Sequence, residues 1–114
     1  MTKQDIFTKV KNHLLTQRAR AFDSRFGCRY RTADQQQSCA VGCLIPDSLY
    51  LSSMEGKGIN DLIEAHPDLA EHGLSTDNCN LLYELQGVHD CLPIKEWEDA
   101  LREVALRHSL DFGQ

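Results

Sequence analysis

The chain lacks several features that would narrow its function. Its five cysteines contain no Cys-x-x-Cys pair, which argues against a zinc knuckle or a thioredoxin-type redox pair. No apolar run approaches the roughly 18 residues that a membrane-spanning helix needs, and the first residues lack the basic-then-apolar layout of a secretion signal. Internal repeats and low-complexity segments are missing too. We therefore expect a cytoplasmic protein, without membrane contact, whose cysteines are mostly free thiols.

What is present is the composition of an ordinary folded domain. The 114 residues are 41% hydrophobic and 25% charged, which suits a single compact domain over residues 1–114. Residues 1–31 hold eight Lys/Arg against two Asp, whereas residues 32–114 hold four Lys/Arg against fifteen Asp/Glu. Either the basic segment packs beside acidic helices, or two faces of opposite sign each bind a partner. We favour the first interpretation because it needs no partner.

Helical periodicity dominates the pattern. Apolar residues at helical spacing predict helices over residues 3–19, from Ile59 to the His66-Pro67 pair, from a cap at Ser75 through Val88, and from Pro93 to about His108. The apolar run 39–45 is compatible with a buried strand or a buried helix, and we choose a helix because Ser38 is a good N-cap. Gly42 within it indicates that another backbone packs closely there.

Residues 28–32 alternate between small or aromatic and charged side chains. This pattern is typical of a half-buried strand with Cys28 and Tyr30 facing inward. A short return strand near residues 36–39 would complete one small β-hairpin at about 28–38. The expected fold class is therefore mostly α (α+β): a single compact domain of about five short helices with this one hairpin.

The central motif carries a resemblance. The residues are Cys28-Arg-Tyr-Arg, Cys39-Ala-Val-Gly-Cys-Leu-Ile-Pro-Asp47, Tyr50 and Met54-Glu-Gly56. Together they resemble a family of small bacteriophage and bacterial proteins, and the spacing from Trp97 to His108 is similar to the way such chains end. The resemblance implies a phage or mobile element as the source. It implies no activity, and it brings no catalytic residues with it.

Cysteine chemistry offers two hypotheses. A thiolate at Cys39 or Cys43 would be a nucleophile if a base such as His89, which is followed by Asp90, lay beside it. Alternatively, Cys39 and Cys43 stand four residues apart on one helix face, and Cys28 would be a third metal ligand. Simple core packing explains these apolar surroundings as well, so we expect buried thiols and no cofactor.

A nucleic-acid site is a further alternative. The basic segment 9–31 interleaves arginines with aromatic residues, and its candidate contacts are Arg18, Arg25, Arg29 and Arg31. Arginines bind phosphate and aromatic rings stack on bases. However, the chain is acidic overall, with a calculated pI near 5.4, and no nucleic-acid-reading motif is visible. We do not expect nucleic acid to be the partner.

Acidic residues near the last predicted helix suggest a protein partner. Glu96, Asp99 and Glu103 are the candidate contacts, because carboxylates in a row complement basic grooves. An ordinary solvated helix face is the plainer interpretation. We expect a small phage or mobile-element accessory protein that acts non-enzymatically in the host cytosol by binding a host protein, with inhibition of a host defence system as its effect. A cysteine-dependent enzyme remains the alternative.

Overall fold

The first helix is defined by its cap. In the computed structural model, which describes residues 1–23, 27–34 and 36–113, α1 runs over Lys3–Gln17. The Thr2 hydroxyl accepts a hydrogen bond from the backbone N–H of Asp5, and the Asp5 carboxylate accepts one from the N–H of Thr2, which closes a capping box. Arg18 then adopts a left-handed conformation at φ +45° and ends the helix. The predicted helix is confirmed except for its last two residues.

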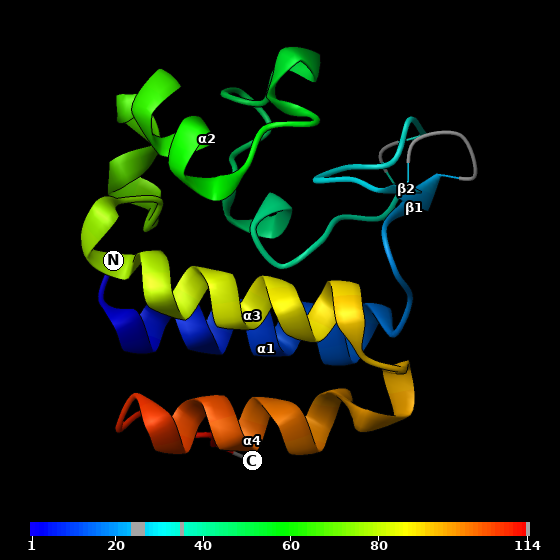
Figure 1. Ribbon diagram of the computed structural model, residues 1–114, viewed down its shortest axis with the longest axis vertical. Helices are drawn as coiled ribbons and strands as arrows, with labels where there is room; N and C mark the ends of the chain where they lie inside the picture. The colour runs from blue at the N-terminus through cyan, green and yellow to red at the C-terminus, as the bar shows by residue number, and fades with distance from the viewer. Residues whose placement is uncertain (24–26, 35, 114) are drawn as a thin grey trace.

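Two further helices pack with α1 (Figure 1). α3 over Cys79–Cys91 and α4 over Trp97–Arg107 each contact α1 and contact each other. Short 3-10 turns at Thr76–Asn78 and Ile94–Glu96 lead into them. The inner sides of the three helices bury large apolar side chains: Ile6, Phe7, Val10, Leu14, Leu81, Leu82, Leu85, Trp97, Leu101 and Val104. Each such burial stabilises the fold by about 1.5–3 kcal/mol, and the helices follow the predicted periodicity. Their starts differ from the prediction: a 3-10 turn follows Ser75 so that α3 begins at Cys79, and α4 begins at Trp97 and not at Pro93.

The remaining half of the molecule, residues 18–78, contains little regular structure. Among its described residues the α-helix is α2 over Ile59–Ala65, and the 3-10 segments are Gly42–Leu44, Ser52–Met54, Pro67–His72 and the Thr76–Asn78 turn that leads into α3. In Figure 1 this loop-rich half covers one side of the α1 and α3 pair, and α4 lies on the other side. In the part of the chain that the structure describes, no helix is long and apolar enough to cross a bilayer.

The predicted α+β description is not supported. β1 (Phe22–Asp23) and β2 (Gly27–Cys28) are two residues long and pair with each other. Over the predicted hairpin at 28–38, a single antiparallel bridge joins Arg31 to Ser38; Gln35, in the predicted turn, lies outside the described residues. The fold is therefore mostly helical.

A side chain takes the place of the missing strand. The two carboxylate oxygens of Glu55 accept hydrogen bonds from the backbone N–H groups of Tyr30 and Arg31, at 2.9 and 3.0 Å. In a longer ladder the Tyr30 N–H would donate to the carbonyl of Cys39. That carbonyl instead accepts a hydrogen bond from the N–H of Cys43 at 3.0 Å. Within the described residues, pairing between the two segments is limited to two backbone hydrogen bonds, from the N–H of Cys39 to the carbonyl of Tyr30 at 3.1 Å and from the N–H of Thr32 to the carbonyl of Gln37 at 3.0 Å. The carboxylate and the turn at Cys43 satisfy the groups that would extend it.

The helix predicted over 39–45 is wrong, although the interpretation of its glycine is confirmed. The segment forms a turn followed by the 3-10 helix Gly42–Leu44. A Cβ atom built at Gly42 would lie 1.9 Å from the carbonyl oxygen of Tyr30. The backbone near Tyr30 therefore packs directly on Gly42, which only a residue without a side chain permits.

Buried polar contacts complete this half. Arg31 is only 8% exposed; it donates to Asp47 at 2.7 Å and to the carbonyl of Ile45, and its guanidinium lies 4.7 Å from the centre of the Tyr50 ring. The Tyr50 hydroxyl donates to Glu55 at 2.6 Å. The sequence motif that carries the resemblance is thus one connected structural unit.

The C-terminal segment returns to α1. The side chain of Gln4 exchanges two hydrogen bonds with the backbone of Asp111, at 2.9 and 2.8 Å. The Phe112 ring lies between two cations, with Lys11 at 4.8 Å and Arg102 at 4.0 Å from its centre. These contacts attach the segment to both α1 and α4.

Candidate functional site

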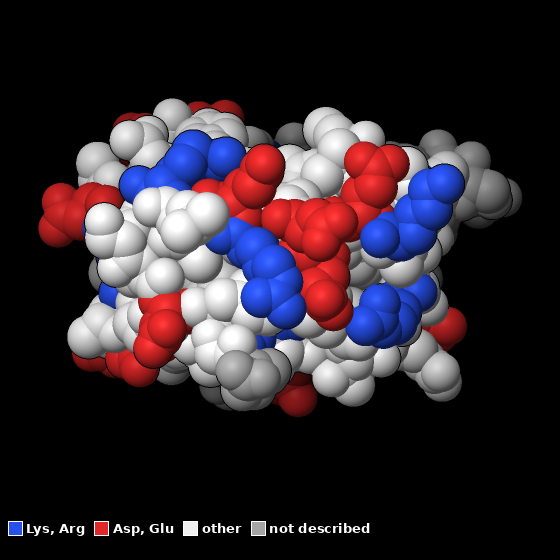
Figure 2. All heavy atoms as spheres, turned by 90° about the horizontal axis from the view of Figure 1, so that it is seen from below, with Lys and Arg blue, Asp and Glu red and all other residues white. Residues whose placement is uncertain are grey.

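The three carboxylates predicted to bind a partner share the outward side of α4. Glu96, Asp99 and Glu103 are all exposed. Asp99 and Glu103 lie four residues apart on one face of α4, and Glu96 stands at its N-cap, three residues before Asp99. Trp97 and Leu101, fully buried, anchor the opposite face. Figure 2, which looks at the molecule from below, shows acidic side chains gathered near the centre with basic side chains around them.

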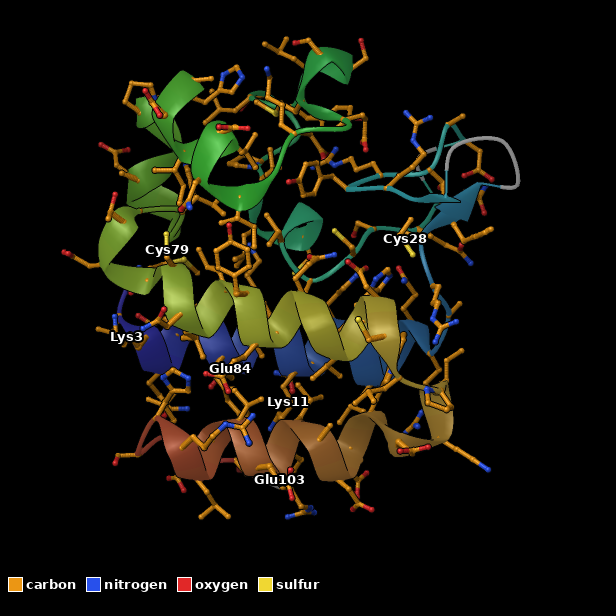
Figure 3. All side chains as sticks on the ribbon, in the orientation of Figure 1. Lys3, Lys11, Cys28, Cys79, Glu84 and Glu103 are labelled. Atoms are coloured by element: carbon orange, nitrogen blue, oxygen red, sulfur yellow. The ribbon has the colours of Figure 1, made fainter. Side chains whose placement is uncertain are left out.

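This face is mixed in character. Arg102 lies 3.6 Å from Glu98, and Arg107 lies 3.8 Å from Glu103, both as exposed ion pairs along the helix; such pairs contribute little to stability. Within the described residues, Glu96 and Asp99 take part in no ion pair. Leu106, three residues beyond Glu103, is 79% exposed. We call Glu96, Asp99, Glu103 and Leu106 the α4 outer face; Figure 3 shows Glu103 on the side of α4 away from α1 and α3.

The two candidate nucleophiles are held as thiols. Cys39 is fully buried, and this burial raises the pKa of its thiol to about 12. Cys43 is half-buried, and burial raises the pKa of its thiol to about 12 as well, although Lys9 acts in the opposite direction. Since the thiolate is the nucleophile, neither cysteine is activated in this fold. The expectation of a buried thiol is confirmed for Cys39.

Both ring nitrogens of the candidate base, His89, are occupied by hydrogen bonds. The Nε2 atom of the fully buried His89 accepts a hydrogen bond from the backbone N–H of Ala21 at 2.9 Å. The ring proton therefore sits on Nδ1, which donates to Asp90 at 2.7 Å. The ring also stacks on Trp97, with 5.8 Å between centres. No nitrogen is left to accept a proton from a thiol.

The cluster around His89 resembles a metal site in composition and spacing, but its hydrogen bonds do not suit a metal ligand. Within the described residues, Cys28, His89 and Asp90 place ligand atoms within 4.8 Å of one another, whereas Cys39 and Cys43, the other sequence candidates, do not belong to this group. Ligation through Nδ1 would move its proton to Nε2, where it would face the Ala21 N–H. Histidine ligands normally donate from their second nitrogen, so this arrangement fits a hydrogen-bonded cluster better. Burial and the nearby Asp90 raise the pKa of the Cys28 thiol.

Much of the basic N-terminal segment serves the fold. Lys3 donates to the carbonyl of Asp77 and to the side chain of Asn78, both at 2.7 Å. Arg20 donates to the carbonyls of His89 at 3.1 Å and Leu92 at 2.5 Å. These carbonyls lie at the end of α3, where cations are favoured. The uneven charge of the sequence is therefore partly accounted for by internal contacts.

The three nucleic-acid candidates that the structure describes differ in exposure. Arg18 is exposed at the end of α1, and Arg31 is buried among loop residues. Arg29 is half-buried and lies 3.8 Å from Glu55. Arg25 lies outside the described residues. The arrangement gives the nucleic-acid alternative no support.

Sequence reasoning missed a groove above α3. It has a volume of about 440 Å³; α3 forms one wall through Tyr83, Gly87 and Asp90, and segments 28–30 and 55–59 form the other. The available signal was Gly87, a glycine in the middle of a predicted helix, where glycine costs about 1 kcal/mol relative to alanine.

Figure 1 shows α4 on one side of the α1 and α3 pair and segments 28–30 and 55–59, which line the groove with α3, on the other side. No protein-family model, curated protein or solved structure matches the chain. The chemistry of these two places is therefore the basis for assigning a function.

Proposed function

We propose that the protein acts non-enzymatically by binding a host protein through the α4 outer face. One observation carries the proposal: three carboxylates and a 79% exposed leucine share the outward side of a helix whose inner side is buried. A row of carboxylates complements a basic surface, and the leucine beside them adds one apolar contact. The resemblance of the central motif supports a phage or mobile element as the source, with the host cytosol as the place of action.

The partner should present a basic surface with an apolar recess. Glu96 and Asp99, which form no ion pair within the described residues, are available to pair with Lys or Arg. Leu106 would enter the recess, since buried apolar anchors supply much of the binding energy at interfaces. Basic grooves of this kind occur on nucleic-acid-processing proteins, and inhibition of such a protein in a host defence system is the effect to test.

Charge reversal tests this surface. The variant combines Glu96→Lys, Asp99→Lys and Glu103→Lys, and its matched control combines Asp61→Lys, Glu64→Lys and Asp68→Lys, three exposed carboxylates on and after α2. Wild type and control should retain one stoichiometric partner from a lysate of the bacterial host. The α4 variant should lose it, and added salt should weaken the wild-type complex because exposed charges are screened.

The opposite result is equally clear. A partner that survives reversal on α4 but is lost in the control variant would move the interface to α2. A Leu106→Ala variant with unchanged affinity would remove the apolar anchor from the proposal. Cys39→Ser, in contrast, should leave binding intact in any molecule that remains folded, because Cys39 is buried.

A further inference from the structure

The groove above α3 has the dimensions of a small-molecule site. Its volume of about 440 Å³ falls in the range of about 300–1,000 Å³ that is typical of ligand pockets. Tyr83, Gly87 and Asp90 follow one another at spacings of four and three residues, so they share one side of α3. The loop residues 55–59 face them across the groove.

Gly87 lines the groove without a side chain of its own. A Cβ atom built at this position would meet no atom within 4 Å, so no neighbour requires glycine. Glycine inside a helix nevertheless costs about 1 kcal/mol relative to alanine. A side chain at this position would occupy the groove, and its absence keeps the groove open. The neighbouring Tyr83 adds a ring that is 48% exposed.

The two walls differ in net charge: the α3 wall carries Asp90, whereas the opposite wall carries Arg29, Lys57 and Glu55. The Glu55 carboxylate is already occupied by hydrogen bonds from two backbone N–H groups. On α3, the Oδ1 atom of Asp90 accepts hydrogen bonds from Gln86 at 2.9 Å and His89 at 2.7 Å, which hold the carboxylate in place while Oδ2 receives neither. On the loop, the carbonyl of Lys57 accepts a hydrogen bond from the Tyr30 hydroxyl at 2.5 Å. Although Lys57 and Asp90 both line the groove, they form no ion pair with each other.

We propose that this groove binds a small dipolar molecule, a free α-amino acid. Its ammonium group would pair with Asp90 and its carboxylate with Lys57, since a ligand with both charges complements both walls. Its side chain would lie on Gly87 and against the ring of Tyr83. This site goes beyond the proposed protein contact and is separated from it by the α1 and α3 pair.

The first experiment identifies the ligand and its place. The ¹⁵N-labelled full chain is titrated with each of the twenty amino acids to millimolar concentration. At least one should shift the amide signals of residues 55–59 and 83–90 saturably. Asp90→Asn, which preserves an oxygen for Gln86 and His89, and Lys57→Met should each weaken binding about tenfold or more. The control variants Asp61→Asn and Lys95→Met, both at exposed positions, should bind as wild type does.

The second experiment assigns each charge to its wall. The amide of the bound amino acid lacks the carboxylate, so its affinity for wild type should be lower than that of the amino acid itself. Its affinity for Lys57→Met should equal its affinity for wild type. The N-acetyl derivative lacks the ammonium group and should show the same pattern with Asp90→Asn. Gly87→Leu should fold, because its Cβ has open space, and should abolish binding. The proposal is overturned if no amino acid shifts the groove signals, or if Gly87→Leu, shown to be folded by its spectrum, binds as wild type does.

Discussion

The helical half and the loop-rich half share one apolar core but differ in the polar contacts that stabilise them. α1, α3 and α4 bury apolar side chains against one another, and apolar burial has little directional requirement. Residues 28–56 also bury apolar side chains, among them Leu44, Ile45 and Met54, but they add directed contacts from two charged side chains, Glu55 and Arg31. Removing one partner of a buried hydrogen bond leaves the other unsatisfied. The loop-rich half should therefore be much more sensitive to conservative substitutions.

The two halves meet at the end of α3. Arg20 donates to the carbonyls of His89 and Leu92, and the N–H of Ala21 donates to the His89 ring. The same chain segment that ends α1 therefore satisfies the carbonyls at the end of α3. The contrast between the halves is testable with single substitutions on each side of this junction.

The largest effect is expected at Gly42. Gly42→Ala places a Cβ 1.9 Å from the Tyr30 carbonyl oxygen, and because this neighbour is backbone, the chain must shift. We expect the free energy of unfolding to fall by about 3 kcal/mol or more, measured by urea denaturation. Gly58→Ala is the control, since its added Cβ meets no atom within 4 Å. Equal stability of the two variants would refute the close backbone contact.

Glu55→Gln should have the next largest effect. The side-chain amide can accept only through its oxygen, so one of the two backbone N–H groups, of Tyr30 or Arg31, would face an NH₂ group. The expected loss is about 2 kcal/mol, by the same measurement. Glu64→Gln, at an exposed position on α2, should change stability little. If Glu55→Gln lowers the free energy of unfolding no more than Glu64→Gln does, the two hydrogen bonds to the Glu55 carboxylate are not needed for stability.

Gly87→Ala should change stability in the opposite direction. Its Cβ meets open space on a helix, so alanine should stabilise the protein by about 0.4–1 kcal/mol. A rise in the melting temperature would confirm that glycine is unnecessary for the fold here, in contrast to Gly42. A fall would indicate that the backbone at Gly87 is packed against something.

The smallest effect is expected at Glu84 and depends on pH. Burial acts to raise the pKa of Glu84, but hydrogen bonds from His108 and Arg107 outweigh it, and the pKa lies below its ordinary value of 4.5. A lowered pKa means that the ionised form stabilises the fold above pH 4.5 and that this contribution is lost as pH falls through the folded-state pKa. Glu84→Gln should therefore cost less than about 1 kcal/mol at pH 7.

The matched measurement uses denaturation at several pH values. The stability difference between wild type and Glu84→Gln should narrow steadily below pH 4.5. Glu71→Gln, at an exposed position, provides the baseline. A difference that stays constant down to low pH would mean that the contacts of Glu84 with α4 are not ionic.

Some features of the candidate sites could be predicted from the sequence and others could not. The outward placement of Glu96, Asp99 and Glu103 was predictable, because helical spacing and the buried Trp97 determine which side of α4 faces solvent. The enclosure of His89 was not, since it depends on Ala21, far away in the chain. Only the spacing of residues within one helix can be worked out without knowing how the chain folds back.

The sequence by itself determined α1, α3 and α4 and their buried faces. Apolar periodicity is a local property of the chain, and burying the apolar face of each helix stabilises the fold. It also determined that a backbone would pack against Gly42. Only the tertiary structure decided that residues 28–38 would not form a hairpin, since the carboxylate that satisfies Tyr30 and Arg31 comes from Glu55, on a separate loop. Local patterns carry no information about such a partner, whose position depends on the path of the whole chain.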